Sequence, residues 1–118
     1  MGGGGGGGPL RFGRTRGGPL RIHKDKQDKH IQGSKNYDQQ IANQKTPSIL
    51  TEDPEQLLRE GAGKGKVVGP NKEVVDFGRI IGKFYDEETG KYYDTTRGTI
   101  HYDQKGGAHI VPARPNDW

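Results

Sequence analysis

The sequence predicts an α+β domain in which N-terminal helices pack on a small twisted antiparallel β-sheet, preceded by a disordered Gly-rich arm. Three observations predict this arrangement. Residues 1–20 are dominated by Gly, including the unbroken run Gly2 to Gly8. Helix-capping residues stand at Ser34 and Asp53. After Lys66 the chain consists of short apolar runs separated by Gly-containing turns, a pattern typical of antiparallel strands.

The N-terminal arm has almost nothing to bury, so it cannot offset the entropy cost of ordering itself. We therefore predict a disordered Gly/Arg-rich linker over residues 1–23 and one folded domain over 24–118. The net charge is +4, and residues 1–30 carry seven Lys or Arg against two Asp. Such an arm can bind phosphates without sequence preference or serve only as a soluble linker, and both interpretations stay open.

Several classes of protein are excluded. The chain contains no Cys, so it has neither a disulfide framework nor a thiolate metal site. No stretch approaches the ~20 apolar residues of a membrane span, and the N-terminus lacks the apolar segment of a signal peptide. The 118 residues suffice for one small domain.

The capping patterns predict two helices. Ser34 begins a short helix through about Gln44, after a solvated polar approach over Lys24–Gly33. Asp53 caps a second helix over 54–60, and Gln56 completes a capping-box pattern with it. The Gly-rich residues 61–66 lack the spacing of a phosphate-binding P-loop and predict a hinge between helix and sheet.

Strands are predicted from the apolar runs that follow the hinge. They cover Val67-Val68, Glu73–Phe77, Ile80–Tyr85, Lys91–Asp94, Thr95–Tyr102 with a bend at Gly98, and Ala108–Val111.

The last two strands carry the residues of greatest chemical interest. If Asp103–Gly107 forms a five-residue hairpin loop, His101 pairs with His109 on one face of the sheet. The neighbouring residues Ile100, Tyr102, Ala108 and Ile110 then take the other face. Two adjacent imidazoles are compatible with metal binding, with incidental surface histidines, or with general acid–base chemistry. No third metal ligand stands at helical or hairpin spacing, so we expect no metal and no cofactor.

RNA cleavage by transesterification needs such a pair, because one ring removes the 2′-OH proton and another protonates the leaving 5′-oxygen. Four residues on or next to the His101 strand are candidates for contacting the phosphate, namely Thr96, Arg97, Thr99 and Tyr102. The alternative for Arg97 is a plain surface charge.

The sequence also resembles a known family, the bacterial polymorphic toxin type 50 domain. The resemblance runs from about Asp25 to Pro115. Its motifs are Lys26–Gly33, Ser48–Thr51, Glu73–Gly78, Thr95–Gly98, Ile100–Tyr102 and His109–Pro115. The resemblance rests on the shared order and spacing of these motifs, because each motif alone is weak.

The resemblance implies a C-terminal toxin module of a secreted effector of interbacterial competition, delivered to the target-cell cytoplasm. It implies a metal-independent RNase of the barnase/EndoU/colicin/RelE-like group and a cognate immunity protein as partner. By motif position the catalytic candidates are His30, His101 and His109, with Lys26 and Arg97 in support. We expect the free toxin to be a monomer that acts on tRNA or another cellular RNA.

One departure leaves the geometry of the histidines open. The family often has a shorter loop between the two late histidines, with Ser at the position of Asp103. An odd separation would place His101 and His109 on opposite faces unless a bulge intervenes, and His30 would then supply the second catalytic group. Two other functions also remain: a non-catalytic RNA-binding module, and a phage- or virion-associated interaction module.

Overall fold

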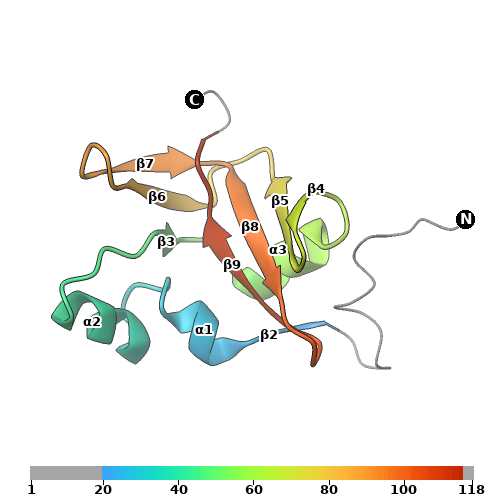
Figure 1. The fold of residues 1–118 in the computed structure, drawn as a ribbon, viewed down its shortest axis with the longest axis horizontal. Helices are drawn as coiled ribbons and strands as arrows, with labels where there is room; N and C mark the ends of the chain where they lie inside the picture. Colours follow the sequence, from blue (N-terminus) through green and yellow to red (C-terminus); the bar gives the residue numbers. More distant parts are fainter. Residues whose placement is uncertain (1–19, 116–118) are drawn as a thin grey trace, which may run out of the picture.

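A computed structural model describes residues 20–115, which form an α+β fold with three helices and two small sheets (Figure 1). The predicted arm, residues 1–19, lies outside the described residues. The helices are α1 (Lys24–Asp28), α2 (Lys35–Ala42) and α3 (Pro54–Gly61). The strands are β2 (Arg21–Ile22), β3 (Ile49–Leu50), β4 (Lys66–Gly69), β5 (Lys72–Asp76), β6 (Gly82–Asp86), β7 (Lys91–Thr95), β8 (Arg97–Tyr102) and β9 (Gly107–Pro112). Strand β2 lies within the stretch predicted to be linker.

The strands form two sheets, where the sequence predicted one. The larger sheet has the order β2-β9-β8-β5-β4 and the smaller has the order β3-β6-β7. All pairs are antiparallel except β2 with β9, which run parallel. The sequence could not show β2 and β3, because a two-residue strand is defined only by its distant partner.

The predicted strand Thr95–Tyr102 is wrong in one respect, because the chain changes sheet inside it. Thr95 pairs with Gly82 in the small sheet, whereas Arg97 pairs with Asp76 in the large one. The Thr95 hydroxyl accepts a hydrogen bond from the Arg97 N–H at 3.1 Å and donates one to the Ala113 carbonyl at 2.7 Å. These bonds stabilise the crossing at Thr96, and β8 continues through Gly98, where a bend was predicted.

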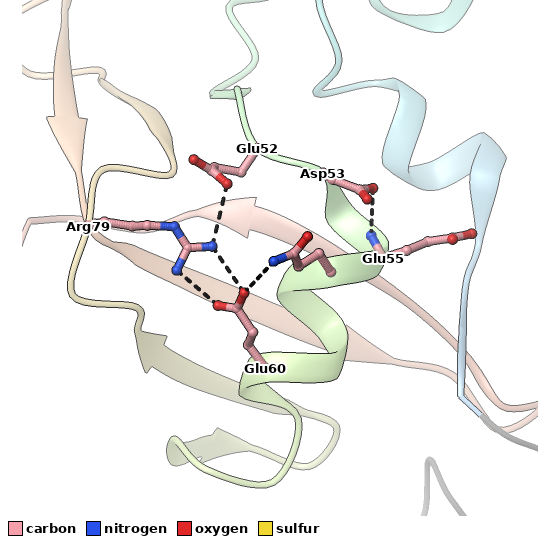
Figure 2. A network of polar contacts seen from close by, with 6 residues as sticks. Glu52, Asp53, Glu55, Glu60 and Arg79 are labelled. Carbon is pink, nitrogen blue, oxygen red and sulfur yellow. Dashed lines mark hydrogen bonds and ion pairs between the residues drawn. The ribbon is translucent and has the colours of Figure 1, made fainter.

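The helix caps are confirmed. The Ser34 hydroxyl accepts from the Tyr37 N–H, and the Asp53 carboxylate accepts from the Glu55 N–H. The predicted capping box is wrong, because the Gln56 amide donates to Glu60 instead of turning back to Asp53. Glu60 is also held from its other side, because Arg79 binds it through both guanidinium ends and reaches Glu52, as Figure 2 shows.

The core lies between α3 and the large sheet. Leu57 and Leu58 of α3 pack with Ile100, Ile110 and other buried apolar residues. In Figure 1 helix α3 lies behind β8 and β9, while α1 lies beside β2 and β9 and α2 lies beyond α1, farther from the large sheet. Thus α3 covers one face of the β8–β9 hairpin.

The Gly-rich segment after α3 connects helix and sheet, as predicted. Glu73 of β5 is fully buried, and its carboxylate accepts hydrogen bonds from the N–H groups of Gly63 and Gly65, both at 2.8 Å. The Tyr102 hydroxyl donates to the same carboxylate. A buried carboxylate must be satisfied in this way, so Glu73 ties the segment to the end of β8.

Among residues 20–115 no helix is long and apolar enough to cross a membrane.

Candidate active site

The β8–β9 hairpin holds His101 and His109 side by side. The two residues are direct cross-strand partners, and their rings stack with centroids 4.7 Å apart and planes inclined by 11°. The predicted register is therefore confirmed. The turn that sets it is stabilised by Asp103, whose Oδ1 accepts from the N–H groups of Lys105 and Gly107, each at 2.8 Å. Gly106 closes the turn with a φ of 86°, which suits glycine.

The two faces of this hairpin differ as the alternation predicted. Ile100, Tyr102, Ala108 and Ile110 are at most 5% exposed and face the core. His101 and His109 are half-buried on the other face, together with Thr99 and Arg97. Strand periodicity thus places the imidazoles where a ligand can reach them.

His30 reaches the same region from the turn that follows α1. Its backbone carbonyl accepts from the Leu50 N–H at 2.8 Å, and its ring Nδ1 lies 2.9 Å from the Ser48 carbonyl oxygen. Because a carbonyl only accepts, Nδ1 carries the proton and donates it. The neutral ring therefore leaves Nε2 as a free acceptor.

The segment that carries His30 is anchored by Gln27, which is 1% exposed. Its Nε2 donates to the Ile110 carbonyl at 2.8 Å, and its Oε1 accepts from the Ile110 N–H at 2.7 Å. The amide thus pairs with the edge of β9 as a neighbouring strand would. The predicted solvated approach over Lys24–Gly33 is exposed or partly exposed apart from Gln27, but it forms α1, and the buried Gln27 side chain takes the place of a strand.

All three rings are shifted towards the neutral form. Burial, with the charge of Lys29, lowers the pKa of His30 despite the hydrogen bond to Ser48. Burial and the charge of Lys72 lower the pKa of His101. Burial, followed by the charges of His101 and His30, lowers the pKa of His109 to about 4. The charge of His30 lowers the pKa values of both His101 and His109, so the three histidines lie close enough to form one group, which we call the histidine cluster.

Two lysines bring positive charge to the histidine cluster. Lys26 of α1 lowers the pKa of both His101 and His109. Lys72 of β5 is the direct cross-strand partner of His101. Lys26 was a sequence candidate, whereas Lys72 was missed. Lys72 could have been found only from the register of β5 against β8, and no local sequence pattern determines that register.

The remaining candidates lie apart from the cluster. Thr99 and Arg97 share its face, but Arg97 stands four residues along β8 from His101, about 13 Å at strand spacing. The Arg97 guanidinium donates to the Arg114 carbonyl at 3.3 Å. Thr96 lies in the crossing between the sheets. Tyr102 points to the opposite, buried face, where its hydroxyl binds Glu73, so its side chain does not face the cluster.

Within the part of the chain that the structure describes, no group of three or more His, Cys, Asp or Glu residues is placed to hold a metal ion.

Taken together, the fold and the site define a small α+β domain that presents clustered imidazoles and lysines on an open sheet face. Comparison with protein families identifies it more closely. The bacterial toxin 50 family matches residues 22–112, most of the chain, so the protein belongs to that family. The matched region includes all three histidines of the cluster. No curated protein and no solved structure gives a significant match.

Proposed function

We propose that this toxin domain is a metal-independent endoribonuclease. It cleaves RNA by attack of a ribose 2′-oxygen on the adjacent phosphorus, which forms the O2′–P bond and breaks the P–O5′ bond. The products are a 2′,3′-cyclic phosphate and a free 5′-hydroxyl. The reaction needs a base for the 2′-OH proton, an acid for the leaving oxygen and positive charge near the phosphorane.

The observation that supports this proposal most directly is the convergence of His30, His101 and His109, which come from segments about 70 residues apart in the sequence. Incidental surface histidines have no reason to stack, to gather where the charge of one lowers the pKa of another, or to lie beside two lysines. Perturbed titratable groups gathered on one accessible face are typical of catalytic sites.

We assign His30 as the general base. Its Nδ1–H is fixed by the Ser48 carbonyl, which leaves Nε2 as the acceptor for the 2′-OH proton. Its lowered pKa keeps the ring neutral near pH 7, as a base requires. Ser48 thus has the positioning role that a carboxylate has in other base-orienting pairs.

We assign the stacked pair His101–His109 as the general acid. A charge on His101 lowers the pKa of His109, so the two rings resist carrying two protons at once. The pair therefore takes up at most one proton. Because burial lowers the pKa of both rings, only the protonated fraction of the pair acts as the acid, and its proton passes to the 5′-oxygen as the P–O5′ bond breaks. Lys72 and Lys26 supply the charge that stabilises the phosphorane, and Thr99 and Arg97 extend the polar face for the rest of the RNA.

Membership of a toxin family supports a proposal for the biological setting. We propose that residues 24–118 act as the C-terminal module of a secreted effector and that residues 1–23 tether it to the remainder. The RNase acts in the cytoplasm of the target cell, and a cognate immunity protein protects the producing cell. A tRNA or another cellular RNA is the target.

The function is tested by incubating the purified protein with total RNA in the presence of EDTA and mapping the cleaved ends. We expect cleavage that leaves 2′,3′-cyclic phosphate and 5′-hydroxyl ends. Binding without turnover would favour a non-catalytic RNA-binding module instead. An inert protein that binds no RNA would favour an interaction module of the kind found on virions.

The assignment of acid and base is tested with a substrate whose leaving 5′-oxygen is replaced by sulfur, which leaves without protonation. The variants His101→Gln and His109→Gln should lose rate on normal RNA and regain it on the sulfur substrate. His30→Gln should be slow on both substrates, because the 2′-OH still needs a base. Equal behaviour of all three variants would overturn the assignment.

A further inference from the structure

A cleft beside the histidine cluster has no role in the chemistry above. It has a volume of about 660 Å³ and lies between β2, α1 and the β8–β9 turn. Its lining includes Arg21, His23, Lys26, Asn71 and Lys105. This volume is within the range of pockets that hold small ligands, and it is ample for one nucleotide.

The cleft adjoins the cluster on two sides. Lys26 lines it and also lowers the pKa values of His101 and His109, so its ammonium acts on both places. Asn71 lines it and precedes Lys72, the cross-strand partner of His101. Lys26 and the Asn71–Lys72 segment therefore connect the cleft to the cluster.

The charge of the cleft is positive. Three side chains of its lining are cationic, Arg21, Lys26 and Lys105, against the single carboxylate of Asp103. Asp103 directs one carboxylate oxygen at the N–H groups of its own turn, at Lys105 and Gly107, which offsets part of its negative charge locally. The net field in the cleft therefore favours an anion.

The lining favours a phosphate over a base. The one aromatic residue of the lining other than His23 is Tyr102, and its ring is buried on the core face with its hydroxyl on Glu73. Tyr102 therefore offers no face on which a base can stack, and the single ring of His23 stands among three cationic side chains, whose guanidinium and ammonium groups bind phosphate oxygens well.

We propose that this cleft is a phosphate subsite that holds the nucleotide flanking the scissile bond of a single-stranded RNA. Arg21 and Lys105 bind the flanking phosphate, and Lys26 lies between it and the scissile phosphate. The recognition is independent of base identity. The inference rests on the proposed RNase function for the nature of the ligand.

The test measures binding separately from cleavage. A short fluorescent oligonucleotide with 2′-deoxy sugars throughout has no 2′-OH nucleophile and cannot react, and its affinity is measured over a range of salt concentrations. For single strands the slope of log K against log salt falls by about 0.7 for each phosphate that the protein no longer neutralises. We expect this decrease, or up to twice it, for Arg21→Gln combined with Lys105→Gln. The matched control, Arg59→Gln combined with Lys91→Gln, removes the same charges from exposed positions outside the cleft and should leave the slope unchanged.

Cleavage then distinguishes the two proposals. On a dinucleotide, the cleft variant should keep the wild-type rate. On the same dinucleotide with an added terminal phosphate, tested at the 5′ and then at the 3′ end, the wild-type protein should gain kcat/KM at one end and the variant should not. An unchanged salt slope in the cleft variant overturns the subsite. A reduced slope with no cleavage of any RNA by the wild-type protein overturns the RNase and leaves the subsite in place.

Discussion

The two faces of the β8–β9 hairpin are made by alternate residues of the same strands, yet they have opposite properties. On one face Ile100 and Ile110 are fully buried against α3. On the other face, His101 and His109 stack and are partly exposed to solvent, and Lys72 is the cross-strand partner of His101. Since one register serves both faces, the packing that stabilises the core also sets the separation of the imidazoles. Substitutions on the two faces should therefore affect different measurements.

The largest effect is expected on the histidine face. Replacing His109 with Gln removes half of the proposed acid but no core contact, so we expect the cleavage rate to fall about 10²- to 10⁴-fold with little change in melting temperature. Single-turnover cleavage of RNA and thermal unfolding are the two measurements. Wild-type activity in this variant would remove His109 from the mechanism.

The adjacent residue should show the reverse pattern. Ile110→Ala leaves a cavity between β9 and α3, and we expect a loss of about 2–5 kcal/mol in the free energy of unfolding. Below its melting temperature the variant should cleave at close to the wild-type rate per folded molecule. Chemical denaturation measures the free energy of unfolding. Active-site titration with the non-cleavable oligonucleotide counts the folded molecules, so that the cleavage rate can be expressed per folded molecule. A rate loss as large as that of His109→Gln would show that a substitution on the core face also disrupts catalysis on the histidine face.

Local patterns predicted this hairpin, although the shorter loop of the family left a second arrangement of its histidines open. Alternating apolar residues and the Asp103–Gly107 turn gave its register, and the caps at Ser34 and Asp53 gave two helices. The features that were missed depend on contacts between distant segments. Gln27 is a polar residue in a charged stretch, and only the unpaired edge of β9 explains its burial. The position of His30 followed from family resemblance alone, because nothing near it in the sequence indicates the Ser48 carbonyl.

Gln27 bonds the backbone of the core residue Ile110 and lies in the α1 segment that carries Lys26 and leads to His30, so its loss should affect both stability and cleavage rate. Gln27→Leu leaves the N–H and carbonyl of Ile110 without their partner, and we expect a loss of about 1–3 kcal/mol in unfolding free energy. The turn with His30 and the side chain of Lys26 should also shift, which lowers the cleavage rate. The matched control is Gln56→Leu, which removes only an exposed bond to Glu60 and should change neither quantity.

The smallest expected effect concerns the dependence of stability on pH. The pKa of His109 is about 4 in the folded protein, below the ordinary 6.5 of an unfolded chain, so the unfolded state takes up a proton first as the pH falls. The folded state loses stability between about pH 6.5 and 4, and His30 and His101 contribute in the same direction. With an allowance for solvent screening at this half-buried site, we expect up to about 2 kcal/mol from His109.

The wild-type protein and His109→Gln should therefore differ in the slope of unfolding free energy against pH within this window. Above pH 7 the slopes should coincide, because both the folded and unfolded states then carry a neutral ring. Parallel curves throughout would show that the stacked pair does not resist protonation, and the single-proton acid would then have no basis.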